Sequence, residues 1–140
     1  TGIACDIKNK DRFLLWESLS HIGGIEVLIL CLMAGSRFIL LKKFSAKKFW
    51  KQIRKYKITK LHYLGGILDI LIKKKSKKID RNHKVKLAFG AGSRKETYHE
   101  FKERFNIPLR EVYGMTEASS FTTINFKKKI RFYRKSFALV

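Results

Sequence analysis

The sequence predicts an α/β fold, part of a doubly wound and mostly parallel sheet. Three observations support this class: strand-like and helix-like segments alternate along the chain, the connections between them are short, and glycines follow most of the strand-like segments. This alternation is typical of a parallel sheet covered by crossover helices. With 140 residues, of which 45% are hydrophobic, the chain is long enough for a domain with its own core.

The first half of the chain supplies two strand–helix pairs. Arg12–Glu17 reads RFLLWE and predicts a strand, and Gly23–Gly35 predicts a helix that is apolar nearly all round and hence buried. A second strand is expected at Ser36–Leu41. Ser45–Tyr56 predicts a helix with Ser45 as its N-cap, because a serine side chain can accept a hydrogen bond from the first turn.

The second half continues the alternation. Ile58–Leu64 predicts a third strand, followed after two glycines by a helix at Ile67–Lys74. Lys84–Phe89 predicts a fourth strand, Arg94–Phe105 a helix with an apolar face, and Leu109–Tyr113 a fifth strand.

The net charge of the chain bears on which classes of molecule it could bind. There are 32 basic and 11 acidic residues, a formal charge of +21, which favours nucleic acid or an acidic membrane surface. The lysines are nevertheless spread over every segment, and no RNA-binding signature, helix-turn-helix or zinc-finger spacing accompanies them. Nucleic-acid binding is therefore disfavoured, although a basic nucleic-acid-binding module remains the alternative function.

Two further patterns bear on location. The apolar run Val27–Ala34 is too short for a membrane span, which needs about 20 residues. Cys5 and Cys31 have no metal-ligand spacing, and Cys31 lies in an apolar run where a reduced, buried thiol is usual. The sequence therefore predicts a cytoplasmic protein without a membrane span, and it gives no expectation about oligomeric state.

The segments that follow the strands hold the candidate functional groups. They read SLSHIGG, LGG, GAGS and GMTE after the first, third, fourth and fifth strands. In a parallel sheet these segments lie at the carboxyl-end edge, where such sheets bind ligands. We therefore expect the functional side chains at this edge.

Each of these groups has a functional and a structural reading. Gly90–Gly92 would let backbone approach a ligand closely, but a strand-to-helix turn often needs glycine for steric reasons alone. Tyr113 could stack on a base, although a core tyrosine is commoner. Thr116 offers a hydroxyl to phosphate and Glu117 a hard oxygen to Mg²⁺. His21 could be catalytic or a loop histidine.

Together these motifs resemble one family. VYGMTEAS, with LAFGAG about twenty residues before it and SLSHIGG near the start, is similar to the adenylate-forming acyl-CoA synthetases, and most similar to their carnitine/crotonobetaine-CoA ligase-type branch. The resemblance covers Asp11 to about Ser120. It implies the large N-terminal domain of an acid–thiol ligase that uses ATP, Mg²⁺ and CoA. Such an enzyme converts a carboxylic acid to an acyl-adenylate and then to an acyl-CoA.

The resemblance also implies roles for the nucleotide-binding residues. In the family, the turn that matches Gly90, Ala91 and Gly92 contacts adenosine. The aromatic residue that matches Tyr113 stacks beside adenine, and Gly114 follows it in the same cofactor-binding motif.

The remaining roles concern catalysis and the acyl substrate. The residue matching Thr116 contacts the nucleotide phosphate, and the one matching Glu117 helps to hold Mg²⁺, so these two are the expected catalytic residues. Residues matching His21 and Met115 lie near the acyl pocket. No protein nucleophile is required, because the substrate carboxylate attacks ATP.

Several family features are absent from the sequence. It contains no Ser/Thr/Gly-rich phosphate loop, no ribose-binding aspartate after the last motif and no domain with the catalytic lysine, and it does not begin with methionine. We therefore expect a middle slice of a larger enzyme, inactive by itself, or else a nonfunctional gene remnant. Residues 1–125 would be a partial AMP-binding domain.

Residues 126–140 are expected to be a frameshifted or non-native tail. One choice of codons for residues 131–138, read one base later, encodes Gly-Ser-Ile-Gly-Lys-Ala-Leu-Pro, which resembles the continuation expected in the family. The lysine run at 127–129 would be a natural slippage site.

Overall fold

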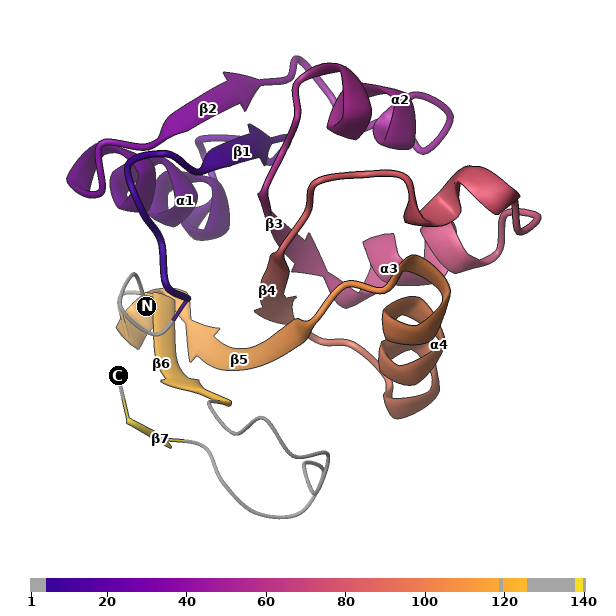
Figure 1. Cartoon of the computed structure of the whole chain (residues 1–140). Helices are drawn as coiled ribbons and strands as arrows, with labels where there is room; N and C mark the ends of the chain where they lie inside the picture. Colours follow the sequence, from indigo (N-terminus) through magenta and orange to yellow (C-terminus); the bar gives the residue numbers. More distant parts are fainter. Residues whose placement is uncertain (1–4, 119, 126–137, 140) are drawn as a thin grey trace.

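The computed structural model describes residues 5–118, 120–125 and 138–139, and a seven-stranded sheet lies at its centre (Figure 1). The strand order is β2-β1-β3-β4-β5-β6-β7. The five strands from β2 to β5 in this order are parallel to one another. β6 pairs antiparallel with β5, and β7 pairs antiparallel with β6. The strands are β1 (Arg12–Leu15), β2 (Arg37–Leu40), β3 (Lys60–Leu64), β4 (Leu87–Ala91), β5 (Leu109–Met115), β6 (Ser120–Ile124) and β7 (Ala138–Leu139).

Helices cover both faces of the sheet, which confirms the predicted α/β class and its doubly wound arrangement. In Figure 1, α1 lies on one side and α2, α3 and α4 on the other. The helices are α1 (Ile22–Met33), α2 (Phe49–Lys55), α3 (Gly65–Ile72) and α4 (Lys95–Phe105), with short 3-10 helices η1 (Lys78–Arg81) and η2 (Thr116–Ala118).

Two hydrophobic cores lie on either side of the sheet because strand side chains alternate between its faces. In β1, Leu14 packs with the core under α2, α3 and α4, whereas Phe13 and Leu15 pack with the core under α1. The larger core is aromatic: Trp50 of α2 stacks on Phe105 of α4, with 4.3 Å between ring centroids. All five predicted strands and all four predicted helices are present, with shifted ends.

The prediction that the first helix is buried all round was wrong. Val27 and Cys31 face the sheet, but Ile29 and Leu32 are 47% and 66% exposed and Met33 is 82% exposed. Only one side of α1 meets the sheet, and none of the described elements covers its outer side. The apolar sequence therefore does not by itself indicate burial.

The predicted N-cap of the second helix was also wrong. The helix begins at Phe49, and its N-cap position is held by Lys48, which makes no side-chain cap bond. Ser45 acts through its backbone instead: its carbonyl accepts hydrogen bonds from the amides of Lys48 (3.0 Å) and Phe49 (2.9 Å). A turn thus precedes the helix and moves its start by one turn.

Both cysteines are buried free thiols, and burial raises the pKa of each, that of Cys5 to about 12. No helix in the described ranges is long and apolar enough to cross a membrane. The expected non-native tail falls mainly on residues 126–137 and 140, which lie outside the described residues.

Candidate functional site

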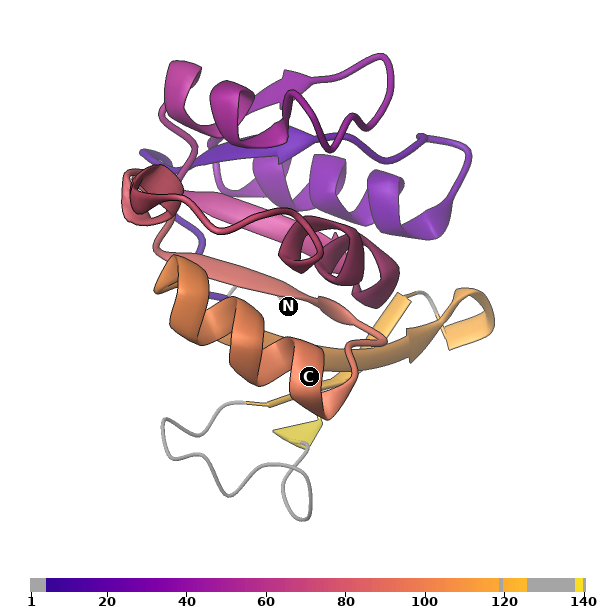
Figure 2. The same cartoon turned by 90° about the vertical axis from the view of Figure 1, so that its right-hand side faces the viewer.

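The carboxyl ends of β1, β3, β4 and β5 lie at one edge of the sheet, since these four strands are parallel neighbours. In Figure 2 their arrowheads point the same way, and the segments that follow them lie together at that end. The edge therefore brings the turn after β4 next to the end of β5, and the loop after β1 next to the start of α3. This is the edge at which the sequence predicted the site.

The glycines at the ends of β3 and β4 are required for different structural reasons. A Cβ on Gly90 would lie 1.9 Å from the backbone oxygen of Tyr63, so close strand packing requires this glycine. Gly92 has φ +76°, which favours glycine, and a Cβ there would meet nothing within 4 Å. A Cβ on Gly65, the first residue of α3, would lie 1.7 Å from the Gly92 oxygen. Of the two readings of this turn, packing thus explains Gly90, while the open space beside Gly92 is free for a ligand.

Glu111 of β5 holds the turn after β4 in place. Its Oε1 accepts a hydrogen bond from the backbone amide of Ser93 (3.0 Å). Its Oε2 accepts hydrogen bonds from the hydroxyls of Ser93 (2.6 Å) and Tyr63 (2.7 Å). Burial, followed by the neighbouring Glu111 carboxylate, raises the pKa of Tyr63 well above its ordinary value. The neutral phenol is therefore kept as a donor, and these hydrogen bonds link β3, β5 and the turn after β4.

We expect Glu111→Gln to lower the free energy of unfolding by about 1–2 kcal/mol, because charge-assisted hydrogen bonds become neutral ones. The pKa of Tyr63 should fall in this variant, because the repulsion between the phenolate and the carboxylate is removed. Ultraviolet absorbance during an alkaline titration measures the pKa, and Tyr63→Phe identifies which transition belongs to this residue. An unchanged Tyr63 transition would contradict the assigned contact.

The end of β5 presents the other predicted nucleotide-binding residues. Tyr113 is 54% exposed and Met115 is 45% exposed. Thr116 and Glu117 follow in η2 and are exposed as well. The pairing of β5 with β6 is irregular at Gly114, where the register shifts. Tyr113 is therefore an exposed aromatic ring near the carboxyl end of β5 rather than a core residue.

His21 lies on the other half of the edge, beside an open cavity of about 830 Å³. Its Nδ1 accepts a hydrogen bond from the amide of Gly23 (3.3 Å), so the side chain caps α1. The cavity is lined by apolar side chains, two lysines and a few polar groups. They are Trp16, Glu17, Ser18, Leu19, His21, Leu40, Leu41, Lys42, Lys43, Phe44 and Leu64.

A buried hydrogen bond between two side chains lies at the wall of this cavity. Glu17 is paired with Nδ1 of His62, and their side chains are only 6% and 3% exposed. The His62 ring packs against Phe89 and Phe121. A Cβ on Gly23 would lie 2.6 Å from Oε2 of Glu17, so this glycine makes room for the carboxylate beside the first turn of α1. The pair joins the segment that follows β1 to β3.

The structure groups the predicted residues into two parts. Tyr113 and Gly114 lie near the end of β5, and Thr116 and Glu117 follow it in η2; β5 is the neighbour of β4 and its Gly92 turn. His21 belongs to the cavity, whereas Met115 is not one of the residues that line it.

Sequence reasoning missed the residues that support the site. Glu111 and Glu17 were included in predicted strands without a role, and His62 was treated as part of a third strand. One signal was available in the sequence: a charged residue lies inside or beside a strand that is expected to be buried. A buried charged group needs a hydrogen-bonding partner, so such a residue indicates a polar contact.

Known proteins match this chain in sequence and in fold. The model of a family described as "AMP-binding enzyme" matches residues 2–136. The human protein named long-chain fatty acid transport protein 6 is 39% identical over 117 residues, which are 83% of this chain and 18% of that protein. The rat protein named long-chain fatty acid transport protein 2 is 41% identical over 126 residues, or 89% of this chain and 20% of that protein.

Two solved structures share the fold. O-succinylbenzoate coenzyme A synthetase from Bacillus subtilis, in complex with ATP and magnesium ion, has a TM-score of 0.75 at 21% identity and covers 89% of this chain and 27% of its own. Fatty acyl CoA synthetase from Mycobacterium tuberculosis has a TM-score of 0.77 at 18% identity, with 89% and 26% covered. The chain spans about a fifth of the length of its curated relatives. The narrower resemblance to carnitine/crotonobetaine-CoA ligases is not shown by these matches.

Proposed function

This chain belongs to the AMP-binding enzyme family, and from that membership we propose that it is part of an ATP-dependent acid–CoA ligase of the cytoplasm. In the proposed reaction, the carboxylate of an acid attacks the α-phosphorus of ATP and releases pyrophosphate. The thiol of CoA then attacks the acyl-adenylate and releases AMP. The attacking groups all belong to substrates, so the protein has to bind, orient and stabilise charge rather than supply a nucleophile.

The observation that carries this proposal is that several residues suited to binding a nucleotide lie at one edge of the sheet. The exposed ring of Tyr113 is available to stack on adenine. The open side of Gly92 leaves backbone accessible in the next turn along the edge. Thr116 directly follows the strand and offers its hydroxyl to a phosphate oxygen.

The cavity beside His21 supports a carboxylic acid as the second substrate. Its walls include the T-shaped aromatic pair Trp16 and Phe44, with ring centroids 5.4 Å apart. Lys42 and Lys43 also line it. An apolar cavity with cationic groups suits a molecule that has an apolar body and one carboxylate. We propose this cavity, rather than the surroundings of Met115, as the acyl site.

Glu117 is the residue that would hold Mg²⁺. Within the described part of the chain, no group of three or more His, Cys, Asp or Glu side chains is placed to hold a metal ion. A single exposed carboxylate still fits Mg²⁺ that arrives with a nucleotide, because Mg²⁺ uses one or two carboxylates and completes its shell with waters and phosphates. Bound there, the ion would offset the charge that develops on the phosphate.

A chimera tests the proposal, with residues 11–120 of this chain in place of the matching segment of a full-length relative. We expect it to exchange pyrophosphate into ATP when a fatty acid is present. Glu117→Ala should lower this exchange by about 100-fold, the usual loss for one charge-stabilising contact. Glu100→Ala, a change of an exposed glutamate on α4, is the matched control and should have no effect. Equal activity of the two variants would rule out the proposed role of Glu117.

A further inference from the structure

The connection from α3 to β4 concentrates positive charge. Residues 73–86 hold eight of the chain's lysines and arginines and one acidic residue, a formal charge of +7. One tenth of the chain thus carries one third of its net charge of +21. The basic residues are Lys73, Lys74, Lys75, Lys77, Lys78, Arg81, Lys84 and Lys86.

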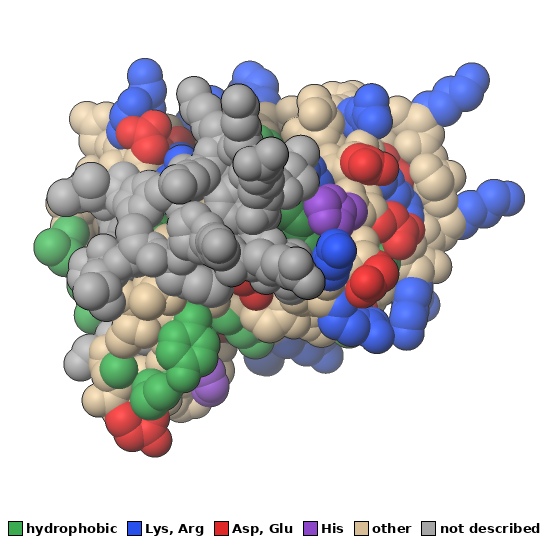
Figure 3. All heavy atoms as spheres, turned by 90° about the horizontal axis from the view of Figure 1, so that it is seen from below, with side chains coloured by type: hydrophobic (Ala, Val, Ile, Leu, Met, Phe, Trp, Pro, Cys, Tyr) green, Lys and Arg blue, Asp and Glu red, His purple; other side chains and the backbone are tan. Residues whose placement is uncertain are grey.

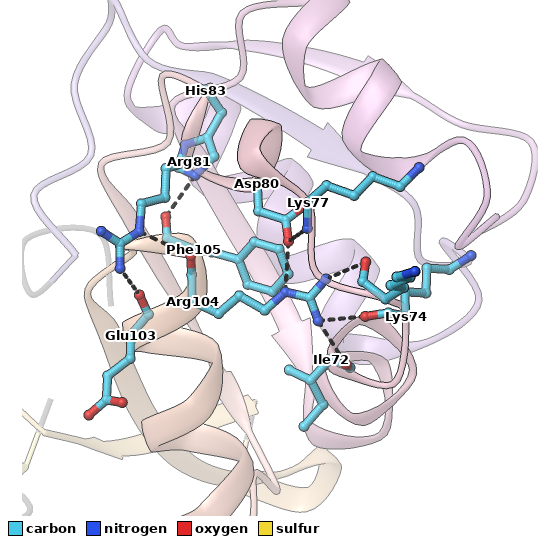
Figure 4. Close-up of polar contacts among 10 residues, drawn as sticks. Ile72, Lys74, Lys77, Asp80, Arg81, His83, Glu103, Arg104 and Phe105 are labelled. Atoms are coloured by element: carbon cyan, nitrogen blue, oxygen red, sulfur yellow. Dashed lines mark hydrogen bonds and ion pairs between the residues drawn. The ribbon is translucent and has the colours of Figure 1, made fainter.

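Arg104 of α4 fixes the backbone of this connection (Figure 4). Its Nη1 donates hydrogen bonds to the carbonyls of Ile72 (2.7 Å) and Lys74 (2.6 Å), and its Nη2 to that of Lys75 (3.1 Å). Its Nε donates to Oδ2 of Asp80 (2.8 Å), and the side chains of this ion pair are 12% and 11% exposed. The carbonyls of the lysine run are therefore turned inward.

Two further contacts hold the rest of the connection. Oδ2 of Asp80 also accepts a hydrogen bond from the amide of Lys77 (3.0 Å). The guanidinium of Arg81 donates to the carbonyls of Glu103 (2.7 Å) and Arg104 (3.3 Å). A run of like charges normally repels itself and stays disordered. Here Asp80, Arg81 and Arg104 hydrogen-bond to backbone groups, and the ammonium groups of the exposed lysines face the solvent.

The outer surface of the connection combines cations with one apolar side chain. Lys75, Lys77 and Lys78 are exposed, and in Figure 4 the side chain of Lys77 extends away from the Arg104 contacts. Ile79 follows them in η1 and is 43% exposed. The exposed large hydrophobic side chains of the described chain include one aromatic, Tyr113, which lies at the opposite edge. A surface that binds single-stranded nucleic acid usually offers aromatic rings to the bases, and this one does not.

The surface of α4 beside this connection carries acidic side chains. Glu100 and Glu103 of α4 line the hollow between that helix and the connection, so a small anion in the hollow would meet two carboxylates. On the right of Figure 3, the side on which α4 lies in Figure 1, acidic side chains lie among lysines and arginines. The favourable anionic partner is therefore an extended surface that faces the outer lysines rather than a single phosphate inside the hollow.

We propose that the outer surface of residues 73–81 docks on a lipid bilayer with anionic headgroups, with the lysines at the headgroups and Ile79 inserted between them. Lysines at an anionic leaflet attract it additively, and an apolar side chain among them adds a contribution that salt does not screen. The connection leads back to the amino ends of the strands, away from the arrowheads in Figure 2. Docking at the amino ends leaves the carboxyl-end edge of the sheet, the proposed nucleotide site, open to solvent.

Vesicle sedimentation of the 140-residue chain tests this proposal. We expect binding to vesicles of phosphatidylcholine and phosphatidylserine in about a 7:3 ratio, and little binding to phosphatidylcholine alone. Changing Lys73, Lys75, Lys77 and Lys78 to Gln should weaken binding by about 100-fold or more. The matched control changes four exposed lysines of the opposite edge to Gln and should weaken binding much less. The control lysines are Lys42, Lys43, Lys47 and Lys48.

The substitution Ile79→Ser distinguishes binding to a membrane from binding to a nucleic acid. It should weaken vesicle binding by about tenfold and leave any binding of duplex DNA unchanged, because only a bilayer offers an apolar layer. Circular dichroism confirms that each variant is folded. Equal losses in the two lysine variants would show a net-charge effect and overturn the proposal. Loop-dependent binding of DNA without binding of vesicles would overturn it in favour of a nucleic-acid partner.

Discussion

Gly65→Ala is expected to lower the free energy of unfolding by about 3 kcal/mol, at the upper end of the cost of overpacking. The added Cβ would lie 1.7 Å from the carbonyl oxygen of Gly92 and 2.7 Å from the amide nitrogen of Ser93. Both are backbone atoms, so relief requires the turn after β4 to move away from α3. That turn is held by Glu111, and its displacement would break those hydrogen bonds as well. Urea denaturation followed by circular dichroism gives the change.

Gly66→Ala is the matched control for this substitution. Gly66 is the next residue of α3, and a Cβ there would meet nothing within 4 Å. Because alanine is a better helix former than glycine, we expect unchanged stability or a gain of up to about 1 kcal/mol. A loss in both variants would mean that α3 tolerates no side chain at its start, and that the Gly92 contact is not the cause.

Arg104→Met is expected to lower the free energy of unfolding by about 3–5 kcal/mol, the usual cost of removing one partner of a buried ion pair. The variant keeps the apolar part of the side chain, but it removes the guanidinium, which lies over the Phe105 ring, and leaves Asp80 buried without its cation. The carbonyls of Ile72, Lys74 and Lys75 lose their donor as well. The effect should be measured by denaturation in parallel with Arg81→Met, which removes an exposed guanidinium and should cost less than about 1 kcal/mol.

The same ion pair predicts a pH dependence. Burial by itself would raise the pKa of Asp80, but hydrogen bonds from the amide of Lys77 and the guanidinium of Arg104 lower it below its ordinary value of 3.8. A carboxyl group whose pKa is lower in the folded state than in the unfolded state stabilises the fold at any pH above the unfolded-state pKa. This stability is lost as the pH falls through the folded-state pKa. We expect the parent chain to lose stability below about pH 4, with a shallower dependence in Arg104→Met. Equal slopes would contradict the pairing.

The sequence was sufficient for the fold class because the signal is local and repeated. Each strand-like run is followed by a helical period within a few residues, and the crossover rules leave few topologies for such a chain. The family was also recognised correctly, because the segment from Tyr113 to Glu117 is an uninterrupted motif that survives without tertiary information. The carnitine/crotonobetaine-CoA ligase-type branch stays a prediction, which the matches do not show.

Errors arose where the neighbours of an element decide its environment. The apolar sequence of α1 was read as burial on all sides, but Met33 is exposed because no described element packs there. Ser45 was a plausible cap by residue type, yet the preceding turn uses its carbonyl instead. Residue type gives a propensity, and packing determines which hydrogen bonds are made.

The sequence by itself determined the order of strands and helices, the sheet edge that holds the motifs and the family. Only the tertiary structure could decide that Gly90 and Gly65 are required by neighbouring backbone, and that Glu111 secures the turn beside them. It also decided that Arg104 orders a lysine run 30 residues away in sequence. The reason is physical: periodicity and turn propensity act over a few residues, whereas steric exclusion and ion pairing depend on distances between segments that folding alone brings together.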